Sequence, residues 1–159
     1  MDTDRINHDI EIAAPVERVW DALTDPLELA RWFGTDGTMT RDDSTRLELN
    51  WRNHGRYLAR VEEERPPHRF AWRWALAPDV EPAPGNSTLV EFRIKEEPVG
   101  ARVSVTESGF VGLDMTDGQK GTVVNDNLAG WVGGFLGLKQ YLEGYRESAL
   151  PTDEPEQPD

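Results

Sequence analysis

The C-terminal part of the chain limits the fold most, because it predicts a long helix with an apolar side and a glycine-rich side. Large apolar side chains recur at steps of three and four over residues 123–147: Val124, Leu128, Trp131, Phe135, Leu138, Leu142 and Tyr145. This spacing is typical of an amphipathic helix with one buried stripe. Four glycines lie beside it, and each costs about 0.8–1.0 kcal/mol relative to alanine: Gly130, Gly133, Gly134 and Gly137. We therefore expect a helix held by tertiary packing, whose bare backbone either approaches another element or leaves room for a ligand.

The rest of the chain predicts a strand, two short helices and an antiparallel sheet. Residues 5–13 alternate between apolar and polar side chains, which indicates a half-buried strand. Residues 16–23 and 26–33 follow with helical spacing, and Asp25 is placed to cap the second helix. Alternation at period two returns in five segments, at residues 45–51, 56–61, 70–76, 90–95 and 102–106. Because short turns join them, we expect antiparallel strands with one buried face, followed by an irregular connection over Gly109–Gly121.

Composition excludes several classes of partner and chemistry. The chain has 30 acidic and 17 basic residues, a net charge of −13, and such a charge repels nucleic acid and anionic lipid surfaces. It has no apolar run long enough to span a membrane and no secretion leader, which predicts a cytoplasmic protein without a membrane partner. With no cysteine, thiol chemistry and disulfides are excluded.

The length of 159 residues predicts one domain with a hydrophobic core. We assign that domain to residues 1–147. Residues 148–159 contain four acidic residues, three prolines and no basic residue, which is typical of a disordered, solubilising tail.

Several local motifs together resemble a known superfamily. They are the opening run Ile10–Pro26, the pair Trp32-Phe33, the element Ser108-Gly109-Phe110, and Gly130-Trp131 with Leu138. The chain resembles the START-like (SRPBCC) superfamily over about residues 5–146, and within it the branch of homologues of the activator of the heat-shock-protein ATPase, often grouped with polyketide cyclases. The order of the predicted elements gives an α+β fold in which a curved six-stranded antiparallel sheet surrounds a long C-terminal helix and two short helices follow the first strand. The resemblance implies the helix-grip fold, which has this order. It also implies, frequently, a hydrophobic ligand between the sheet and that helix.

Large aromatic side chains on the predicted inner faces are the candidates for ligand binding. Trp72 and Trp74 lie two residues apart on one strand and share a face, while Trp131 and Phe135 lie four apart on the helix expected to cross it. The full candidate set is Trp51, Trp72, Trp74, Phe92, Trp131, Phe135 and His8. A packed core is the alternative, because large aromatic rings fill cores as well as pockets. The glycine-rich side of the helix favours a cavity.

His8 is the polar candidate, flanked by Ile6 and Ile10 on the apolar face of the first strand. Such a histidine can hydrogen-bond a ligand or act as a general base, or it is a buried structural imidazole. The three histidines lack the spacing of metal ligands, and the glycine run is not a dinucleotide fingerprint. The sequence therefore predicts neither a metal nor a cofactor.

Three hypotheses for function stay open at this point. The first is binding of a small hydrophobic or aromatic molecule between the sheet and the C-terminal helix. The second is an enzyme resembling cyclases or dehydratases that uses the same cavity, with His8 and Asn50 as candidates for proton transfer, although Asn50 is on the outer face of its strand. The third, which the family suggests, is a module that interacts with a chaperone ATPase. The glycine pairs of the helix also leave open a homodimer contact.

Overall fold

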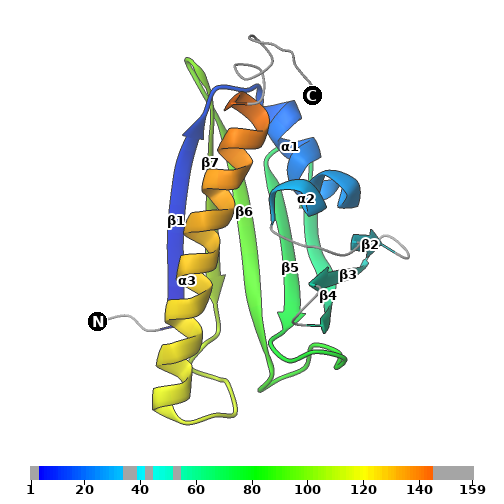
Figure 1. The fold of residues 1–159 in the computed structure, drawn as a ribbon, viewed down its shortest axis with the longest axis vertical. Helices are drawn as coiled ribbons and strands as arrows, with labels where there is room; N and C mark the ends of the chain where they lie inside the picture. Colours follow the sequence, from blue (N-terminus) through cyan, green and yellow to red (C-terminus); the bar gives the residue numbers. More distant parts are fainter. Residues whose placement is uncertain (1–3, 34–38, 42–44, 52–54, 145–159) are drawn as a thin grey trace, which may run out of the picture.

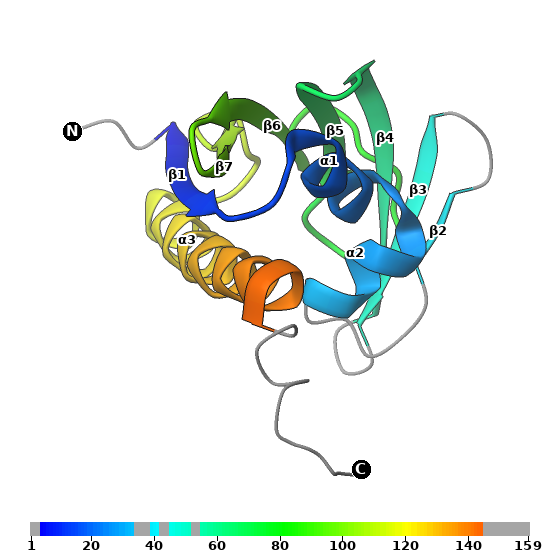
Figure 2. The ribbon, with the colours of Figure 1, turned by 90° about the horizontal axis from the view of Figure 1, so that it is seen from above.

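The computed structural model describes residues 4–33, 39–41, 45–51 and 55–144, and it shows a curved antiparallel sheet with a long helix along its inner face (Figures 1 and 2). The sheet has seven strands in the order β1-β7-β6-β5-β4-β3-β2. The strands are β1 (Arg5–Ile12), β2 (Met39–Arg41), β3 (Arg46–Trp51), β4 (Gly55–Arg65), β5 (Arg69–Ala75), β6 (Ser87–Glu97) and β7 (Gly100–Ser108). The predicted α+β helix-grip architecture is confirmed, with one strand more than predicted.

The additional strand, β2, lies at one edge of the sheet. It is three residues long and pairs with β3, so that Met39 lies opposite Leu49 and Arg41 opposite Leu47. A run of three residues is too short to display a period of two. The strand was therefore not predicted.

The two short helices are confirmed as α1 (Val16–Thr24) and α2 (Pro26–Trp32). The carboxylate of Asp25 accepts the backbone N–H of Leu27 over 3.0 Å, as expected of an N-cap. The buried indole N–H of Trp32 donates to the carbonyl oxygen of Ala22 over 2.7 Å, which fixes α2 against α1. Figure 2 shows the sheet curving from β1 round to β2, with α3 on the β1 side of its concave face and α2 on the β2 side.

The long helix, α3 (Asp117–Lys139), continues into a π-helical turn, η1 (Gln140–Gly144). It begins inside the connection that was predicted to be irregular, and that part of the prediction was wrong. The hydroxyl of Thr116 accepts the N–H of Gln119 over 3.1 Å, and the side-chain oxygen of Gln119 accepts the N–H of Thr116 over 2.9 Å. This reciprocal capping box starts the helix six residues before Val123. Residues 145–147, also predicted as helix, lie outside the described residues.

The apolar stripe of α3 is buried in the C-terminal half of the helix and in η1. Trp131, Phe135, Leu138 and Leu142 are buried, whereas Leu128 is 39 % exposed, contrary to expectation. Tyr145 lies outside the described residues. The stripe is therefore buried from Trp131 onward, while Val123 and Val124 in the preceding turns are partly buried against the core.

The glycines of α3 divide into two pairs with different surroundings. A side chain at Gly137 would place its Cβ 3.0 Å from the carbonyl oxygen of Trp32, and one at Gly134 would lie 3.5 Å from the ring of Phe33. These two glycines allow α3 to approach the end of α2. A Cβ at Gly130 or Gly133 would meet nothing within 4 Å. Both expectations for a bare helix backbone, close approach and open space, are thus realised at different glycines.

Candidate functional site

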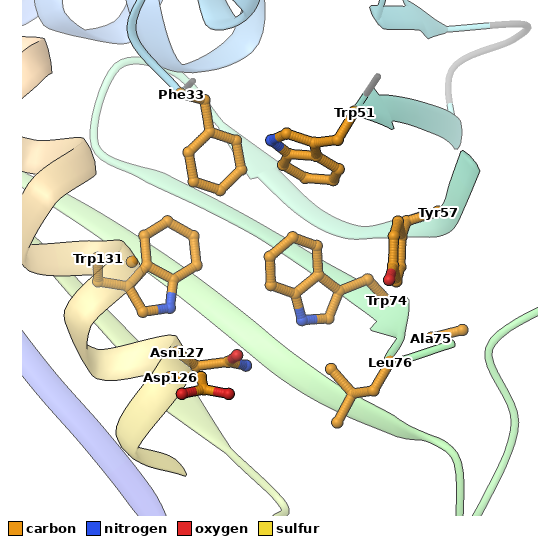
Figure 3. Close-up of a pocket in the computed structure, with 10 residues that line it drawn as sticks. Phe33, Trp51, Tyr57, Trp74, Ala75, Leu76, Asp126, Asn127 and Trp131 are labelled. Atoms are coloured by element: carbon orange, nitrogen blue, oxygen red, sulfur yellow. The ribbon is translucent and has the colours of Figure 1, made fainter. Parts of the chain in front are cut away.

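A cavity of about 410 Å³ opens where the middle of α3 faces the ends of β3 and β5 (Figure 3). Ten described residues line it: Phe33, Trp51, Tyr57, Trp74, Ala75, Leu76, Asp126, Asn127, Gly130 and Trp131. Five of these side chains are aromatic, and they come from the end of α2, from β3, β4 and β5, and from α3. The cavity is therefore assembled from segments far apart in the sequence.

The aromatic rings of the wall support one another. The ring of Phe33 stacks on Trp131 with centroids 5.1 Å apart and on Trp74 with centroids 6.2 Å apart. Trp74 and Trp131 stack on each other at 5.8 Å. Trp51 meets Phe33 and Tyr57 edge to face, each at 5.6 Å. These are favourable aromatic geometries, so the rings stabilise the wall.

Behind the wall lies Glu107 of β7, whose side chain is fully buried. Its carboxylate accepts the indole N–H groups of Trp131 and Trp74 over 2.8 and 3.1 Å. It also accepts the hydroxyl of Thr88 over 2.5 Å and the side-chain amide of Asn127 over 3.0 Å. Among the described residues, neither arginine nor lysine forms an ion pair with it. A carboxylate removed from water is costly unless hydrogen bonds replace its hydration, and here four side chains do so.

The hydrogen bonds of Glu107 set the orientation of the cavity wall. They join α3 to β5, β6 and β7, and they fix two of the five aromatic side chains by their N–H groups. They also orient the amide of Asn127, because only its NH₂ group can donate to a carboxylate. Glu107 is thus a positioning residue that supports the wall without lining it.

Comparison with known proteins identifies the family. The family model for "Activator of Hsp90 ATPase homolog 1-like protein" matches residues 13–143. The chain belongs to this family. The resemblance seen in the sequence is thereby confirmed. A comparison with curated proteins gave no match.

Solved structures share the fold of this family member at low sequence identity. Protein MLL2253 from Mesorhizobium loti has a TM-score of 0.71 and 19 % identity, with 88 % of this chain and 97 % of that chain covered. The Aha1 dimer from Colwellia psychrerythraea has a TM-score of 0.68 and 22 % identity, with 87 % and 96 % covered. DynU16 from the dynemicin biosynthetic locus has a TM-score of 0.65 and 24 % identity, with 88 % covered here and 47 % there, so this chain spans about half of DynU16. These likenesses establish the fold.

The structure brings three of the seven candidate residues to the cavity: Trp51, Trp74 and Trp131. Trp72, Phe92 and Phe135 are at most 1 % exposed and pack in the core behind the wall, with the Trp72 and Phe92 rings 5.1 Å apart. His8 is half-buried on β1, and its ring lies 5.7 Å from that of Phe135. Whether any of the seven binds a ligand stays a prediction.

Sequence reasoning did not select the other residues of the site. Glu107 continues the inward-facing alternation of Val103 and Val105. A carboxylate at an inward-facing position was the signal in the sequence that could have identified it. Asp126 and Asn127 lie in turns of α3 that are mostly exposed. The sequence around them has no regular spacing of apolar side chains that would assign either residue to the inner face of the helix. In the described part of the chain, no group of histidine, aspartate and glutamate side chains could hold a metal ion, and no helix is long and apolar enough to cross a membrane.

The clear pKa shifts lie away from the cavity. A hydrogen bond from Arg102 lowers the pKa of Glu97 at the hairpin of β6 and β7. A hydrogen bond to Glu28, 2.6 Å long, raises the pKa of Arg18 where α1 meets α2. Both are structural ion pairs between neighbouring elements, and neither marks a catalytic group.

Proposed function

We propose that this chain binds a small aromatic or hydrophobic molecule in the cavity between α3 and the ends of β3 and β5. The observation that carries the proposal is a cavity of about 410 Å³ with five aromatic side chains in its wall. Small-molecule sites are typically apolar cavities of roughly 300–1,000 Å³ with a few placed polar groups. Here Asp126 and Asn127 supply the polar groups.

The expected affinity follows from the apolar surface that a ligand can bury. Burying about 200 Å² at about 25 cal/mol per Å² gives about 5 kcal/mol before the costs of association. After those costs, dissociation constants in the micromolar range or weaker are expected. The wall contributes by being ordered in advance, since stacking and Glu107 already hold Trp74 and Trp131.

Two glycines of α3 provide a matched test. Gly130 lines the cavity and Gly133 does not, while both have open space where a side chain would start. Gly130→Leu fills the cavity, and Gly133→Leu adds the same side chain one turn away. We expect calorimetric titration with naphthylmethanol to show micromolar binding to the wild type and to Gly133→Leu, and at least tenfold weaker binding to Gly130→Leu. Equal affinity in all three proteins would refute binding in this cavity.

A cyclase- or dehydratase-like activity in the same cavity remains the alternative. It requires a side chain that exchanges a proton with the ligand. Both oxygens of Glu107 already accept hydrogen bonds, and its side chain is fully buried. His8 and Asn50, which the sequence suggested, are not among the residues that line the cavity. Binding is therefore the better-supported function.

The hypothesis of an interaction with a chaperone ATPase is supported only by the family, whose description names a homologue of the activator of Hsp90 ATPase. It is tested by a pull-down of the purified chaperone at several salt concentrations, because a chain with a net charge of −13 attracts basic surfaces non-specifically at low salt. Retention at low salt alone would argue against a specific interaction.

A homodimer through α3 is a separate proposal, supported by an exposed apolar stripe on the outer side of that helix. Leu128, Val132 and Leu136 are 39 %, 44 % and 52 % exposed and recur at intervals of four residues. One homologous structure is described as a dimer. Sedimentation equilibrium of the wild type and of Leu136→Glu tests whether a second copy of the chain covers this stripe. The wild type should dimerise and the variant should not. A monomeric wild type at all concentrations excludes it.

A further inference from the structure

We infer that the ligand of this cavity carries a positive charge, as an aromatic or alkyl ammonium does. The inference rests on the proposed function and specifies its ligand class. It follows from the side chains of the wall, from the buried carboxylate behind the wall and from the surrounding charge.

The first observation is a hydrogen-bond acceptor of fixed orientation. The NH₂ group of Asn127 donates to Glu107 over 3.0 and 3.2 Å. A carboxylate cannot donate, so the amide cannot turn its oxygen toward Glu107. The amide oxygen therefore points away from Glu107, and Asn127 lines the cavity (Figure 3). A ligand that reaches this oxygen can donate a hydrogen bond to it.

The second observation is that the indole donors of the inner wall are occupied. The N–H groups of Trp74 and Trp131 both donate to Glu107, so these two side chains offer the cavity aromatic carbon. The face of an indole has negative electrostatic potential and attracts cations more strongly than the smaller aromatic rings do. The rings of Phe33, Trp74 and Trp131 stack on one another, so an ammonium group would meet the ring surface of the five aromatic side chains that stacking leaves uncovered.

The third observation is uncompensated negative charge. Asp126 is the one charged side chain among the ten described residues of the wall, and among the described residues nothing pairs with its carboxylate. Two basic side chains close in sequence to wall residues are engaged elsewhere: Arg56, which precedes Tyr57, pairs with Asp79 over 3.2 Å, and Lys120, six residues before Asp126, donates to the carbonyl oxygen of Val111 over 2.6 Å. Glu107 lies behind the indoles, also without a basic partner in the described part of the chain.

The fourth observation concerns the approach of the ligand. The chain has a net charge of −13, so its field concentrates cations near the surface and repels anions. The cavity and the whole molecule thus favour the same sign of ligand charge. An anionic aromatic acid would face Asp126 and the oxygen of Asn127, and the described wall offers it only the neutral donors of Trp51 and Tyr57 and no basic side chain.

Three probes that share one aromatic skeleton test the inference: naphthylmethylammonium, naphthylmethanol and naphthoate. In calorimetric titrations with the full chain at physiological salt, we expect the ammonium to bind about tenfold more tightly than the alcohol, and naphthoate to bind more weakly than both. Equal or tighter binding of the alcohol overturns the ligand class and leaves the proposed function standing. Failure of all three probes to bind overturns the proposed function.

A pair of charge variants separates the local effect from the field of the whole protein. Asp126→Asn removes the carboxylate at the cavity, and Asp21→Asn removes one of equal charge from the exposed side of α1. We expect Asp126→Asn to reduce the ratio of ammonium to alcohol affinity about threefold, and Asp21→Asn to leave it nearly unchanged. The same ratio in both variants, whether reduced or not, overturns the role assigned to Asp126.

Discussion

Trp131 donates its indole N–H to Glu107 over 2.8 Å, and this bond joins the middle of α3 to the inner face of β7. Both partners are buried, Glu107 fully and Trp131 to 98 % since 2 % of it is exposed. A hydrogen bond therefore fixes the position of the helix against the sheet, in addition to apolar packing. Because Trp131 also lines the cavity, the same bond connects the stability of the fold to the shape of the site.

Replacement of Glu107 by glutamine tests this connection. The substitution keeps the shape of the side chain, but it removes the charge and turns one acceptor into a donor. That donor faces groups that themselves donate, among them the indole N–H of Trp74 or Trp131. Hydrogen bonds to a buried charged group are worth about 1.5–3 kcal/mol each. We expect Glu107→Gln to lower the free energy of unfolding by about 2–4 kcal/mol, measured by urea denaturation, and to change the near-UV circular dichroism of the tryptophans.

Glu96 on the neighbouring strand β6 provides the control for that variant, because it is exposed. Glu96→Gln should change the free energy of unfolding by less than about 0.5 kcal/mol. If Glu107→Gln were as stable as Glu96→Gln, the network around Glu107 would have no energetic importance, and the wall would owe its order to ring stacking.

Most of the fold could be predicted from the sequence because the spacing of apolar side chains within a short segment identifies a helix or a strand. An alternation of side chains identifies a strand and its inner face, and helical spacing does the same for α1 and α2. The elements that were missed have no such period. β2 is three residues long. The start of α3 is marked by the capping-box spacing of Thr116 and Gln119, which is present in the sequence but is not followed by an apolar residue until Val123.

The site was predictable in part, for a similar reason. Alternation assigns Trp72 and Trp74 to one face, and the structure confirms that face. It does not say how far each lies from the open end of the sheet, and that distance leaves Trp74 in the cavity wall and Trp72 in the core. For Glu107 the reverse holds. The alternation along its strand assigns it to the inner face, but its four hydrogen-bond donors come from three other elements, which no local pattern predicts.

The capping box at the start of α3 allows a prediction about stability. Thr116→Ala removes the hydroxyl that accepts the N–H of Gln119, and loss of such a cap costs about 1 kcal/mol. Thr116→Ser keeps an oxygen at the same place and should retain most of the stability. Urea denaturation of the two variants checks this. Equal losses would mean that the methyl group of Thr116, and not its hydroxyl, matters.

The glycines of α3 give a prediction in which identical substitutions have opposite signs. Gly133→Ala places a methyl group in open space and should raise the free energy of unfolding by about 0.8–1.0 kcal/mol, the difference in helix propensity. Gly137→Ala gains the same propensity, but its methyl group would lie 3.0 Å from the carbonyl oxygen of Trp32. That carbonyl group cannot move away easily, because the side chain of Trp32 is hydrogen-bonded to the carbonyl oxygen of Ala22. We therefore expect Gly137→Ala to be less stable than the wild type, by about 1–2 kcal/mol in urea denaturation. A stabilising Gly137→Ala would show that α2 yields to α3 and that their close approach does not depend on a bare backbone.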